Sequence, residues 1–454
     1  MFAKGFGIAA GLVALFAASA ASARADAGRS VQEAVDSYLN GSSGDTALVG
    51  GPGSAGYDDG FWIRGGQFLL RINLTLQARF ESFDWVDVAD EPAPGGDLSG
   101  YSLPRATLKL SGEAPCCIRY YAELEFGHAA RVIEEEGMMA MGMAMPMALS
   151  GDVGFPADPG ILREGWIEWG RCPAFNVRMG LVKIANTRQL MTPPEMQQFV
   201  DVSMAAASVG AMLPGYTDRN RDYGVAIHGE LGRNGSLSYL LTITNGDGSV
   251  HRNVLDNTTN DNLAYSARVN WDFLGHVGYE ECALRQRCGQ WVGSVGAWGF
   301  VYEDVVMDKP HETMGRMLDL GVDLALGYGG FSFCAAFTYG ETKDGDPMFE
   351  DMTSTCACVQ AGYLFPGTAW EVAARYSTIW MKMGSGAMEM KDAAHEFGFA
   401  VNYFLDGHRD KLTADVSFIT ADGDENTFSD VYTAYHSTGT GDGILLRFQW
   451  QLAL

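Results

Sequence analysis

The sequence predicts an all-β fold: a transmembrane antiparallel β-barrel of about sixteen strands with an inward-folded third long loop. Three observations lead to this prediction. Segments of alternating apolar and polar residues recur up to the last residue of the chain. These segments are roughly nine to thirteen residues long, which suits a tilted membrane-crossing strand. Short and long connections alternate between them, and beyond the first residues no window has the apolar length of a transmembrane helix.

Residues 1–25 have the features of a secretory signal peptide. A positive charge at Lys4 precedes a run of apolar or small residues, Gly5–Ala23, with A-x-A cleavage choices after Ala23 or Ala25. A membrane-anchor helix is the alternative, but the run is short and rich in alanine and glycine. We therefore expect export to the cell outer membrane.

Residues 26–60 are expected to form a short helix and a flexible tether, and residues 61–454 the barrel. Apolar residues fall at helical spacing between Ser30 and Asn40, and residues 41–56 are rich in Gly and Ser. No later linker separates two domains, so one large barrel takes up the remaining length.

The segment Phe68–Phe80 is a clear example of the predicted strands. Its even positions are apolar and its odd positions are polar, with Leu69 as the exception. The same alternation returns in residues 105–111, 119–126, 265–271, 318–324, 396–403 and 446–454. A soluble β-sandwich also alternates, but its strands average only about five or six residues. Aromatic residues near the ends of the apolar faces, such as Trp271, Tyr403 and Trp450, favour the membrane barrel.

The connections give the strand count. Short ones, rich in turn-forming residues, lie near residues 114–117, 171–174, 232–235, 327–330, 365–368 and 406–411. Eight long ones span residues 84–100, 129–160, 184–221, 246–260, 304–315, 342–352, 382–393 and 422–441. Eight long connections imply sixteen strands if residues 273–290 form a longer periplasmic turn. The short connections would then face the periplasm and the long ones the exterior.

The third long connection is the most informative. Its part 190–221 is longer than ordinary loops and contains apolar residues, among them Phe199, Val200 and Met204, that a solvated loop does not need. Sixteen-stranded barrels of this kind fold a loop inward at this place to narrow the lumen. An outer flap that covers other parts of the protein is the alternative.

Several segments resemble one known family, the phosphate-selective porin O and P family of outer-membrane porins. They are Trp166-Ile167-Glu168-Trp169, Val177–Lys183, Phe199-Val200-Asp201, Arg221–Glu230, Tyr239–Gly248 and Leu263–Arg268. The likeness runs from about Phe61 to the carboxyl terminus and is densest between residues 160 and 272.

The resemblance implies a trimeric channel for passive diffusion of small hydrophilic solutes or ions, including anions such as phosphate. It also implies basic residues along the lumen, where arginine binds oxyanions through paired donors. The candidate channel-lining or anion-binding residues are the bases on the polar face of the predicted strands and those that border the third loop. The first group is Arg71, Arg79, Arg105, Lys109, Arg119, Arg178, Arg268, Arg375 and Arg447, and the second is Lys183, Arg188, Arg219 and Arg221.

Acidic residues share the polar face with these bases. They are Glu81, Glu123, Glu125, Glu168, Glu230, Asp319, Asp323, Glu371, Glu396 and Asp415. The alternative to a selective channel is therefore a hydrated lumen wall without selectivity, in which opposite charges pair across strands. We expect pairing for most of the bases and a selective role for a few near the third loop.

The second long connection is rich in methionine over residues 138–147. Thioether sulfurs bind Cu(I), which makes Met139, Met141, Met143, Met145 and Met147 candidate ligands. The cluster contains no histidine or cysteine, and methionine is also an adaptable apolar filler. We favour no metal site and no cofactor.

Eight cysteines in an exported chain favour disulfide bonds. Cys282 and Cys288 lie in the longer periplasmic turn and are the candidates for a bridge. Cys116 or Cys117 could pair with Cys172, while Cys334 and Cys358 should be nearly opposite on neighbouring strands.

Nothing in the sequence predicts an enzyme. There is no G-x-S-x-G, no H-E-x-x-H and no phosphate-binding glycine loop, although a Ser/His pair assembled across strands would escape this search. A net charge of -25 disfavours nucleic acid as a partner. The expected partners are outer-membrane lipid, two further copies of the chain and small solutes. A plugged structural or adhesive barrel that binds a partner through its outer loops is the alternative function.

Overall fold

The computed structural model describes residues 54–58, 60–85, 98–127, 162–211, 221–232, 235–246, 263–286, 289–305, 315–343, 351–383, 390–423 and 443–454. The chain divides into two units, residues 1–53 and 54–454. The expected signal peptide and short helix belong to the first unit and lie outside the described residues.

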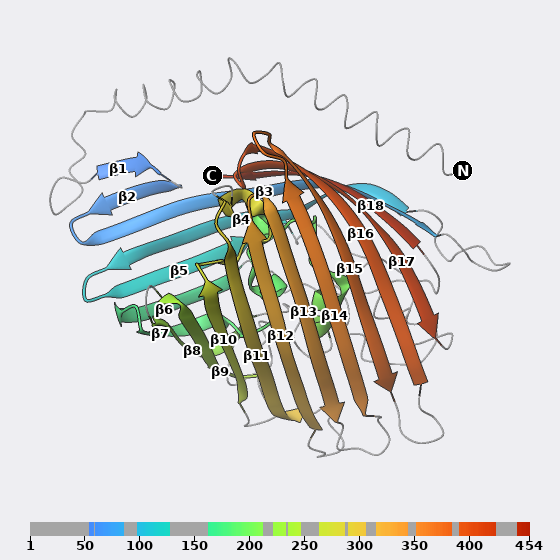
Figure 1. Cartoon of the computed structure of the whole chain (residues 1–454). Coiled ribbons are helices and arrows are strands. Elements are labelled where there is room, and N and C mark those ends of the chain that lie inside the picture. The colour runs from blue at the N-terminus through green and yellow to red at the C-terminus, as the bar shows by residue number, and fades with distance from the viewer. Residues whose placement is uncertain are drawn as a thin grey trace, which may run out of the picture. The chain divides into compact units, whose positions relative to one another are not determined.

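Sixteen strands, β3 to β18, form a closed antiparallel barrel (Figure 1). Each strand pairs with the next along the chain, and β18 pairs with β3 to close the ring. The predicted fold class and strand number are confirmed. The strands are β3 (Phe68–Trp85), β4 (Leu98–Ala114), β5 (Ile118–Glu125), β6 (Leu162–Cys172), β7 (Phe175–Lys183), β8 (Arg221–Leu231), β9 (Leu237–Thr244), β10 (Ala264–Leu274), β11 (Val292–Val305), β12 (Gly315–Tyr328), β13 (Phe331–Lys343), β14 (Met352–Leu364), β15 (Trp370–Met383), β16 (Met390–Asp406), β17 (Asp410–Gly423) and β18 (Gly443–Ala453).

A short hairpin precedes the barrel strands. Its strands are β1 (Ser54–Tyr57) and β2 (Phe61–Gly65), and β2 pairs with residues 68–72 of β3. From Thr75 onward, β18 pairs with the same edge of β3. Residues 54–57 were expected in the flexible tether, and that expectation is wrong, because β2 offers them a strand edge to pair with.

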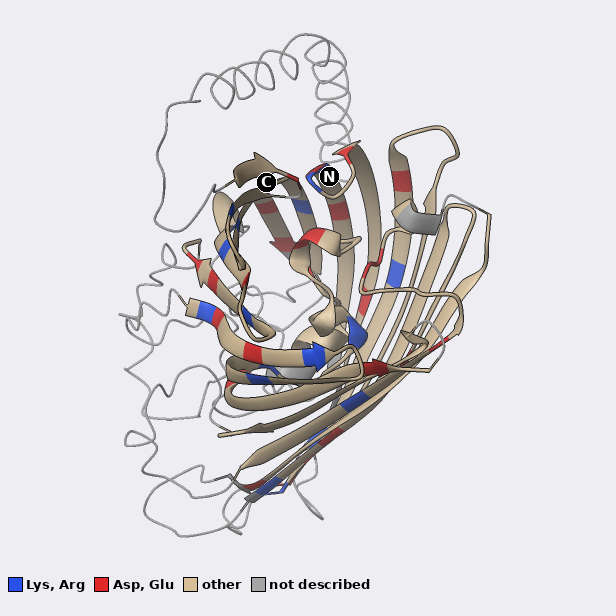
Figure 2. Cartoon of the chain, turned by 90° about the vertical axis from the view of Figure 1, so that its left-hand side faces the viewer, with Lys and Arg blue, Asp and Glu red and all other residues tan. Residues whose placement is uncertain are grey.

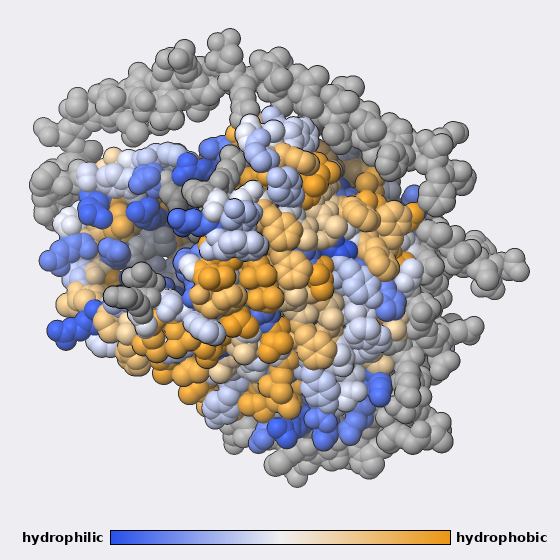
Figure 3. All heavy atoms as spheres, viewed as in Figure 1, coloured by the Kyte–Doolittle hydropathy of each residue, from blue (hydrophilic) through white to orange (hydrophobic). Residues whose placement is uncertain are grey.

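The two faces of the strands differ as the alternation predicts. Outward positions carry exposed apolar side chains, such as Leu320 and Val322 on β12, whereas Asp319 and Asp323 on the same strand are buried. Figure 3 shows apolar side chains gathered over the outer face of the strands, with hydrophilic ones toward the strand ends. Since lipid cannot satisfy backbone polar groups, the closed ring is what allows such a face to contact hydrocarbon.

Each predicted connection coincides with a gap between two strands, although some of its residues belong to strand ends, as residues 390–393 do to β16. The short ones join strand pairs such as β4–β5 and β12–β13 at one end of the barrel, the short-turn end. The strand ends that the long ones connect lie at the other end, the long-loop end. The connection between β10 and β11 belongs to the short-turn end and contains a 3-10 helix, η5 (Ala283–Gln286). No helix among the described residues is long and apolar enough to cross a membrane.

Two bulges change which side chains reach the lumen. On β4, the two residues Leu103 and Pro104 face the single residue Ala78 of β3, between the pairs Gln77–Arg105 and Arg79–Ser102. A bulge tolerates proline, which has no amide hydrogen to donate. On β6, Arg163 is extra between the residues paired with Glu123 and Leu124.

Candidate channel and constriction

The described part of the third long connection, residues 184–211, lies within the ring of strands (Figure 2). It contains α3 (Arg188–Met191), the 3-10 helix η3 (Pro194–Met196) and α4 (Met204–Ala211). Backbone amides of this segment donate to lumen-facing oxygens. The Ala185 amide lies 2.9 Å from the Ser266 hydroxyl on β10, and the Met204 amide lies 2.9 Å from the Glu396 carboxylate on β16. These contacts hold the segment inside the barrel.

An apolar cluster anchors the same segment. Ile184 and Ala205 are buried against lumen-facing residues of β11, β12 and β14 to β16: Trp298, Phe300, Tyr302, Met317, Cys356, Cys358, Ile379, Met381 and Ala394. Removing this much apolar surface from water stabilises the docked segment. The apolar residues that seemed misplaced in a loop thus face the inner wall rather than solvent.

The connection between β10 and β11 also bends into the lumen and meets the third connection. The Glu281 carboxylate accepts hydrogen bonds from Gln189 Nε2 at 3.0 Å, the Gln198 amide at 2.9 Å and Gln360 Nε2 at 3.0 Å. Its own amide donates to the Met196 carbonyl at 3.2 Å. One carboxylate therefore joins two inward-folded segments to the wall at β14.

Solvent reaches the charged side chains of β4 and β6 more than the buried arginines of β10, β15 and β18. The side chains of Arg105, Lys109 and Arg163 are 16%, 19% and 19% exposed. Those of Arg268, Arg375 and Arg447 are only 1% to 2% exposed. The third connection packs over the latter, so water is left beside β4 and β6.

Most bases on the β4 to β8 side have an acidic partner. Arg163 lies 3.3 Å from Glu123, and Arg221 lies 3.3 Å from Glu164. The Lys183 ammonium instead donates to the Met191 carbonyl at 3.3 Å. The wall is thus close to electrically balanced.

Glu195 of η3 crosses to this side of the lumen. Its carboxylate lies 2.6 Å from the Lys109 ammonium on β4. Burial raises the pKa of Glu195, whereas the charge of Lys109 and its hydrogen bond lower the pKa. The lowering effects are larger together, so the pKa of Glu195 lies below its usual range. The third connection therefore presents an ionised carboxylate to β4 at neutral pH.

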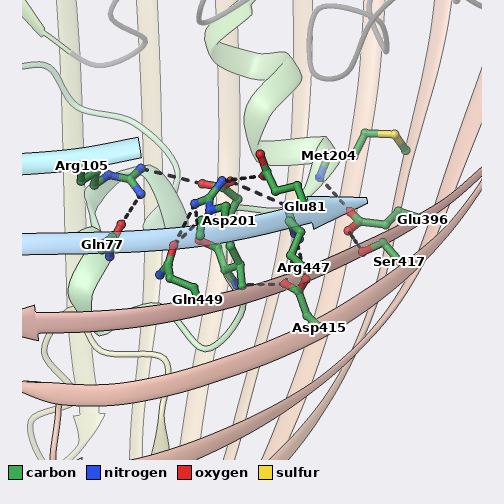
Figure 4. A network of polar contacts seen from close by, with 12 residues as sticks. Gln77, Glu81, Arg105, Asp201, Met204, Glu396, Asp415, Ser417, Arg447 and Gln449 are labelled. Carbon is green, nitrogen blue, oxygen red and sulfur yellow. Dashed lines mark hydrogen bonds and ion pairs between the residues drawn. The ribbon is translucent and has the colours of Figure 1, made fainter. Parts of the chain in front are cut away.

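Asp201 is the second acid of the third connection and the centre of a charge network (Figure 4). Its carboxylate lies 2.7 Å from Arg79, 3.6 Å from Arg447 and 3.8 Å from Arg105. Burial raises the pKa of Asp201, but the charges of Arg79, Arg105 and Arg447 together lower it well below its usual range. The carboxylate is consequently ionised across the physiological pH range.

A cavity of about 710 Å³ lies at the short-turn end, beside β4 to β10. Arg119, Arg178 and His228 line it, and all three contact the buried Glu168 carboxylate at 2.6 to 2.8 Å. Met191 of α3 also lines this cavity, so it reaches from the turns to the third connection.

The comparisons with known proteins agree with this geometry. The model of the family described as phosphate-selective porin O and P matches residues 71–452. The chain belongs to this porin family. The resemblance seen in the sequence is confirmed, and the family places this porin in the outer membrane. No curated protein sequence gives a significant match.

Several solved structures share the fold of this porin at low sequence identity. The anion-selective porin from Comamonas acidovorans has a TM-score of 0.53 and 11% identity, with 85% of this chain and 100% of that chain covered. The outer membrane channel DcaP of Acinetobacter baumannii has a TM-score of 0.51 and 11% identity, over 88% and 100%. OmpT of Vibrio cholerae, an outer membrane protein, has a TM-score of 0.51 and 10% identity, over 86% and 99%. At this identity the likeness shows the fold alone.

The candidate bases of this porin fall into separate regions. Arg79, Arg105, Lys109, Lys183 and Arg221 lie on strands facing the third connection, and Arg119 and Arg178 line the cavity at the short-turn end.

Three other candidates lie apart from these groups. Arg71 donates to the Asp58 carbonyl at 3.2 Å beside the β1–β2 hairpin. Arg188 is buried, and its guanidinium donates to the Val277 and Gly278 carbonyls, so it joins two inward segments rather than lining a passage. Arg219 lies outside the described residues.

Sequence reasoning missed several lumen groups. Arg163 was not predicted to face the lumen, because strict alternation puts neighbouring residues on opposite faces. The β6 bulge instead places Arg163 and its neighbour Glu164 both on the lumen side. The stacked rings of Tyr121 and Trp166, 5.4 Å apart, with the Arg178 guanidinium 3.8 Å above Trp166, were also missed. Trp166 stands at alternating positions with Glu164 and Glu168, and this pattern could have placed the Trp166 ring on the polar face. No pattern in the sequence indicated the bulge.

The cysteines give a mixed outcome. All seven described cysteines are free, and Cys288 lies outside the described residues, so the Cys282–Cys288 bridge stays a prediction. Cys282 itself is fully buried, and burial raises the pKa of its thiol. Cys334 and Cys358, expected nearly opposite each other, lie on the adjacent strands β13 and β14 but are offset by two positions, because Cys334 pairs with Gln360 and Cys358 with Ala336.

No group of three or more His, Cys, Asp or Glu within the described ranges has a metal-binding arrangement. The methionine cluster at 138–147 lies outside these ranges.

Proposed function

We propose that this porin allows passive diffusion of small hydrophilic solutes and ions, with inorganic anions such as phosphate among them. The observation that carries the proposal is the uneven inner wall of a closed barrel. Its β10 to β18 side is covered by inward segments, while charged groups of β4 and β6 keep contact with water. A hydrated strip along one wall is what a diffusion path for polar solutes requires.

Weak selectivity is the expected behaviour of this path. Acids and bases alternate along it, as in the Arg163–Glu123 and Lys109–Glu195 pairs, so neither sign of ion is strongly excluded. The family description favours anions, and so does the shared fold with the anion-selective porin from Comamonas acidovorans. We therefore place phosphate among the conducted ions without exclusive preference.

The proposal includes export and assembly. Residues 1–25 act as the signal peptide, the short-turn end faces the periplasm, and three copies form a trimer, as the family resemblance implies. Crosslinking in native membranes tests the trimer, since a band at three times the monomer mass is expected and a monomer alone contradicts it.

The deciding experiment is ion conductance of the purified protein in a planar bilayer under a KCl gradient, with and without phosphate. We expect stepwise conductance and a reversal potential near zero or slightly on the anion side. Strong cation selectivity contradicts the proposed solute range.

A plugged structural barrel is the second candidate. The two inward segments joined at Glu281 favour it, because they fill part of the lumen. Inserted protein that conducts no ions would support this candidate and reject the porin proposal.

A further inference from the structure

The outer face of β12 to β16 differs in character between its two ends. Toward the short-turn end its outward residues are mainly aromatic, among them Tyr328, Phe331, Tyr363, Trp370 and Tyr403. Toward the long-loop end the outward positions of the same strands hold Arg316, Lys343, Lys382 and Lys391. The sequence has 31 Lys and Arg against 56 Asp and Glu, so a row of bases at one end is specific to this face.

These bases form two cross-strand pairs. Arg316 on β12 pairs in register with Lys343 on β13, and Lys382 on β15 with Lys391 on β16. Like charges directly opposite each other destabilise a strand pair. Acids accompany the first pair, since Lys343 lies 3.1 Å from Glu341, and Glu303 on β11 pairs in register with Arg316.

The second pair has a more positive environment. The outward positions of β14, β15 and β16, all within the described ranges, hold no Asp or Glu. The nearest acid in the outward register is Asp422 on β17, which pairs with Ala393. The Lys382–Lys391 pair therefore sets two positive charges against one negative charge on this part of the outer face.

A polar group lies deeper on the same face. His395 is half-buried on β16, four residues from Lys391, or about 13 Å along the strand. Its Nδ1 lies 3.0 Å from the Tyr376 hydroxyl and 2.9 Å from the Thr378 hydroxyl, both on β15. When Nδ1 accepts from a hydroxyl, Nε2 carries the ring proton and is a donor. No described residue accepts from Nε2, and hydrocarbon cannot do so.

Aromatic side chains surround this imidazole. The Tyr376 ring stacks on it at 6.2 Å, and the Trp380 ring approaches it edge-on at 6.3 Å. Phe397 and Phe399 continue the outward row of β16 and are 47% and 54% exposed. From the long-loop end inward, the face of β15 and β16 (Figure 1) thus offers positive charge, then a polar donor among aromatic rings, then apolar surface. A phospholipid has the matching order of headgroup, ester linkages and acyl chains.

We propose that this face of β15 and β16 binds one lipid with an anionic, phosphate-bearing headgroup. The headgroup lies at the Lys382–Lys391 pair, an ester oxygen of the same lipid accepts from His395 Nε2, and the acyl chains lie along Phe397 and Phe399. Lysines beside a membrane surface attract anionic lipids. The proposal does not depend on the proposed channel activity, because lipid binding needs no ion flow.

Native mass spectrometry of the purified protein in a nonionic detergent tests the site. The anionic probe, dioleoyl phosphatidylglycerol, should bind with an apparent Kd at least about tenfold lower than dioleoyl phosphatidylcholine, whose headgroup has no net charge. In the double variant Lys382→Gln with Lys391→Gln, the two Kd values should agree to within about twofold. Equal Kd values in the wild-type protein, or a preference that survives in the double variant, would overturn the proposal.

Lys343→Gln is the matched control. Lys343 is exposed at the same end of the barrel but contacts Glu341, so this variant should keep the preference for phosphatidylglycerol. Loss of the preference would place the lipid on β12 and β13 and contradict the site.

His395→Phe tests the deeper contact, because it keeps an aromatic ring and removes the donor. Both lipids have ester oxygens, so both Kd values should rise by a similar factor, about threefold to tenfold. Unchanged Kd values would mean that His395 does not contact the lipid.

Two further measurements separate a lipid from other occupants. Inorganic phosphate should not displace bound phosphatidylglycerol, and displacement would show that a free anion occupies the site instead. Native electrophoresis should give the same oligomer for the wild type and the lysine double variant. A double variant that loses its oligomer but keeps its lipid preference would show that this face contacts a second copy of the chain, and the proposal would be wrong.

Discussion

At the scale of single residues, the β4–β5 turn has an unusual backbone. Cys116 and Cys117 have φ angles of 66° and 64°, in the left-handed region that favours glycine. Each such conformation costs an ordinary residue about 1 kcal/mol. The turn therefore keeps two non-glycine residues at a measurable cost in stability.

Cys117→Gly should relieve part of this cost. We expect the free energy of unfolding in lipid vesicles to rise by about 1 kcal/mol, measured by denaturant titration. Cys172→Gly is the matched control, because Cys172 is an exposed cysteine at the end of β6, beside the next short turn, and has no left-handed φ angle. Equal effects of the two substitutions would show that strain at Cys117 is not the cause.

Residue-level prediction from the sequence succeeded where strict alternation holds. It placed Arg79, Arg105 and Lys109 on the lumen face, as found. It missed Arg163, since a bulge shifts the side-chain order by one residue without any local signal. Arg188 was located near the third loop, but the carbonyl groups that bind it lie about ninety residues away in sequence.

At the scale of elements, the connection between β10 and β11 does more than join two strands. The sequence predicted only a longer turn, because its inward course depends on contacts with distant residues such as Gln189, Gln198 and Gln360. Their common acceptor is Glu281. This residue positions the third connection from the short-turn end.

Glu281→Ala should loosen the third connection. The substitution leaves buried amide groups without an acceptor, at a cost of about 1 to 3 kcal/mol for each unpaired group. We expect larger and noisier single-channel conductance in planar bilayers. The control Glu303→Ala removes an exposed acid on β11, and its current traces should match wild type. A quiet wild-type conductance for Glu281→Ala would mean that Glu281 does not hold the constriction.

At the scale of the whole molecule, the sequence predicted the barrel well. Period-two alternation and connection length are local signals that repeat along the strands, so sixteen strands and their order could be read without tertiary information. The contents of the lumen could not, because they depend on which side chains meet across the ring. The Asp201 network, for instance, joins residues separated by more than 100 positions in sequence.

The lipid-facing surface leads to a depth-dependent prediction. Val322 lies midway along β12 and is 52% exposed, while Leu231 ends β8 and is 42% exposed. Val322→Arg should lower the free energy of unfolding in vesicles by about 2 to 4 kcal/mol, and Leu231→Arg by at most about 1 kcal/mol. Equal costs at the two positions would contradict burial of the β12 face in hydrocarbon.

The pairing of β3 with β18 has a consequence for folding. This seam joins the first and last strands of the ring, and Gln77 bonds to Gln451 across a separation of 374 residues. Asp201, from the middle of the chain, contacts Arg79 on one side of the seam and Arg447 on the other. Loop-closure entropy makes such distant contacts late events. Closure of the cylinder and docking of the third connection should thus occur together, after the last strand has been made.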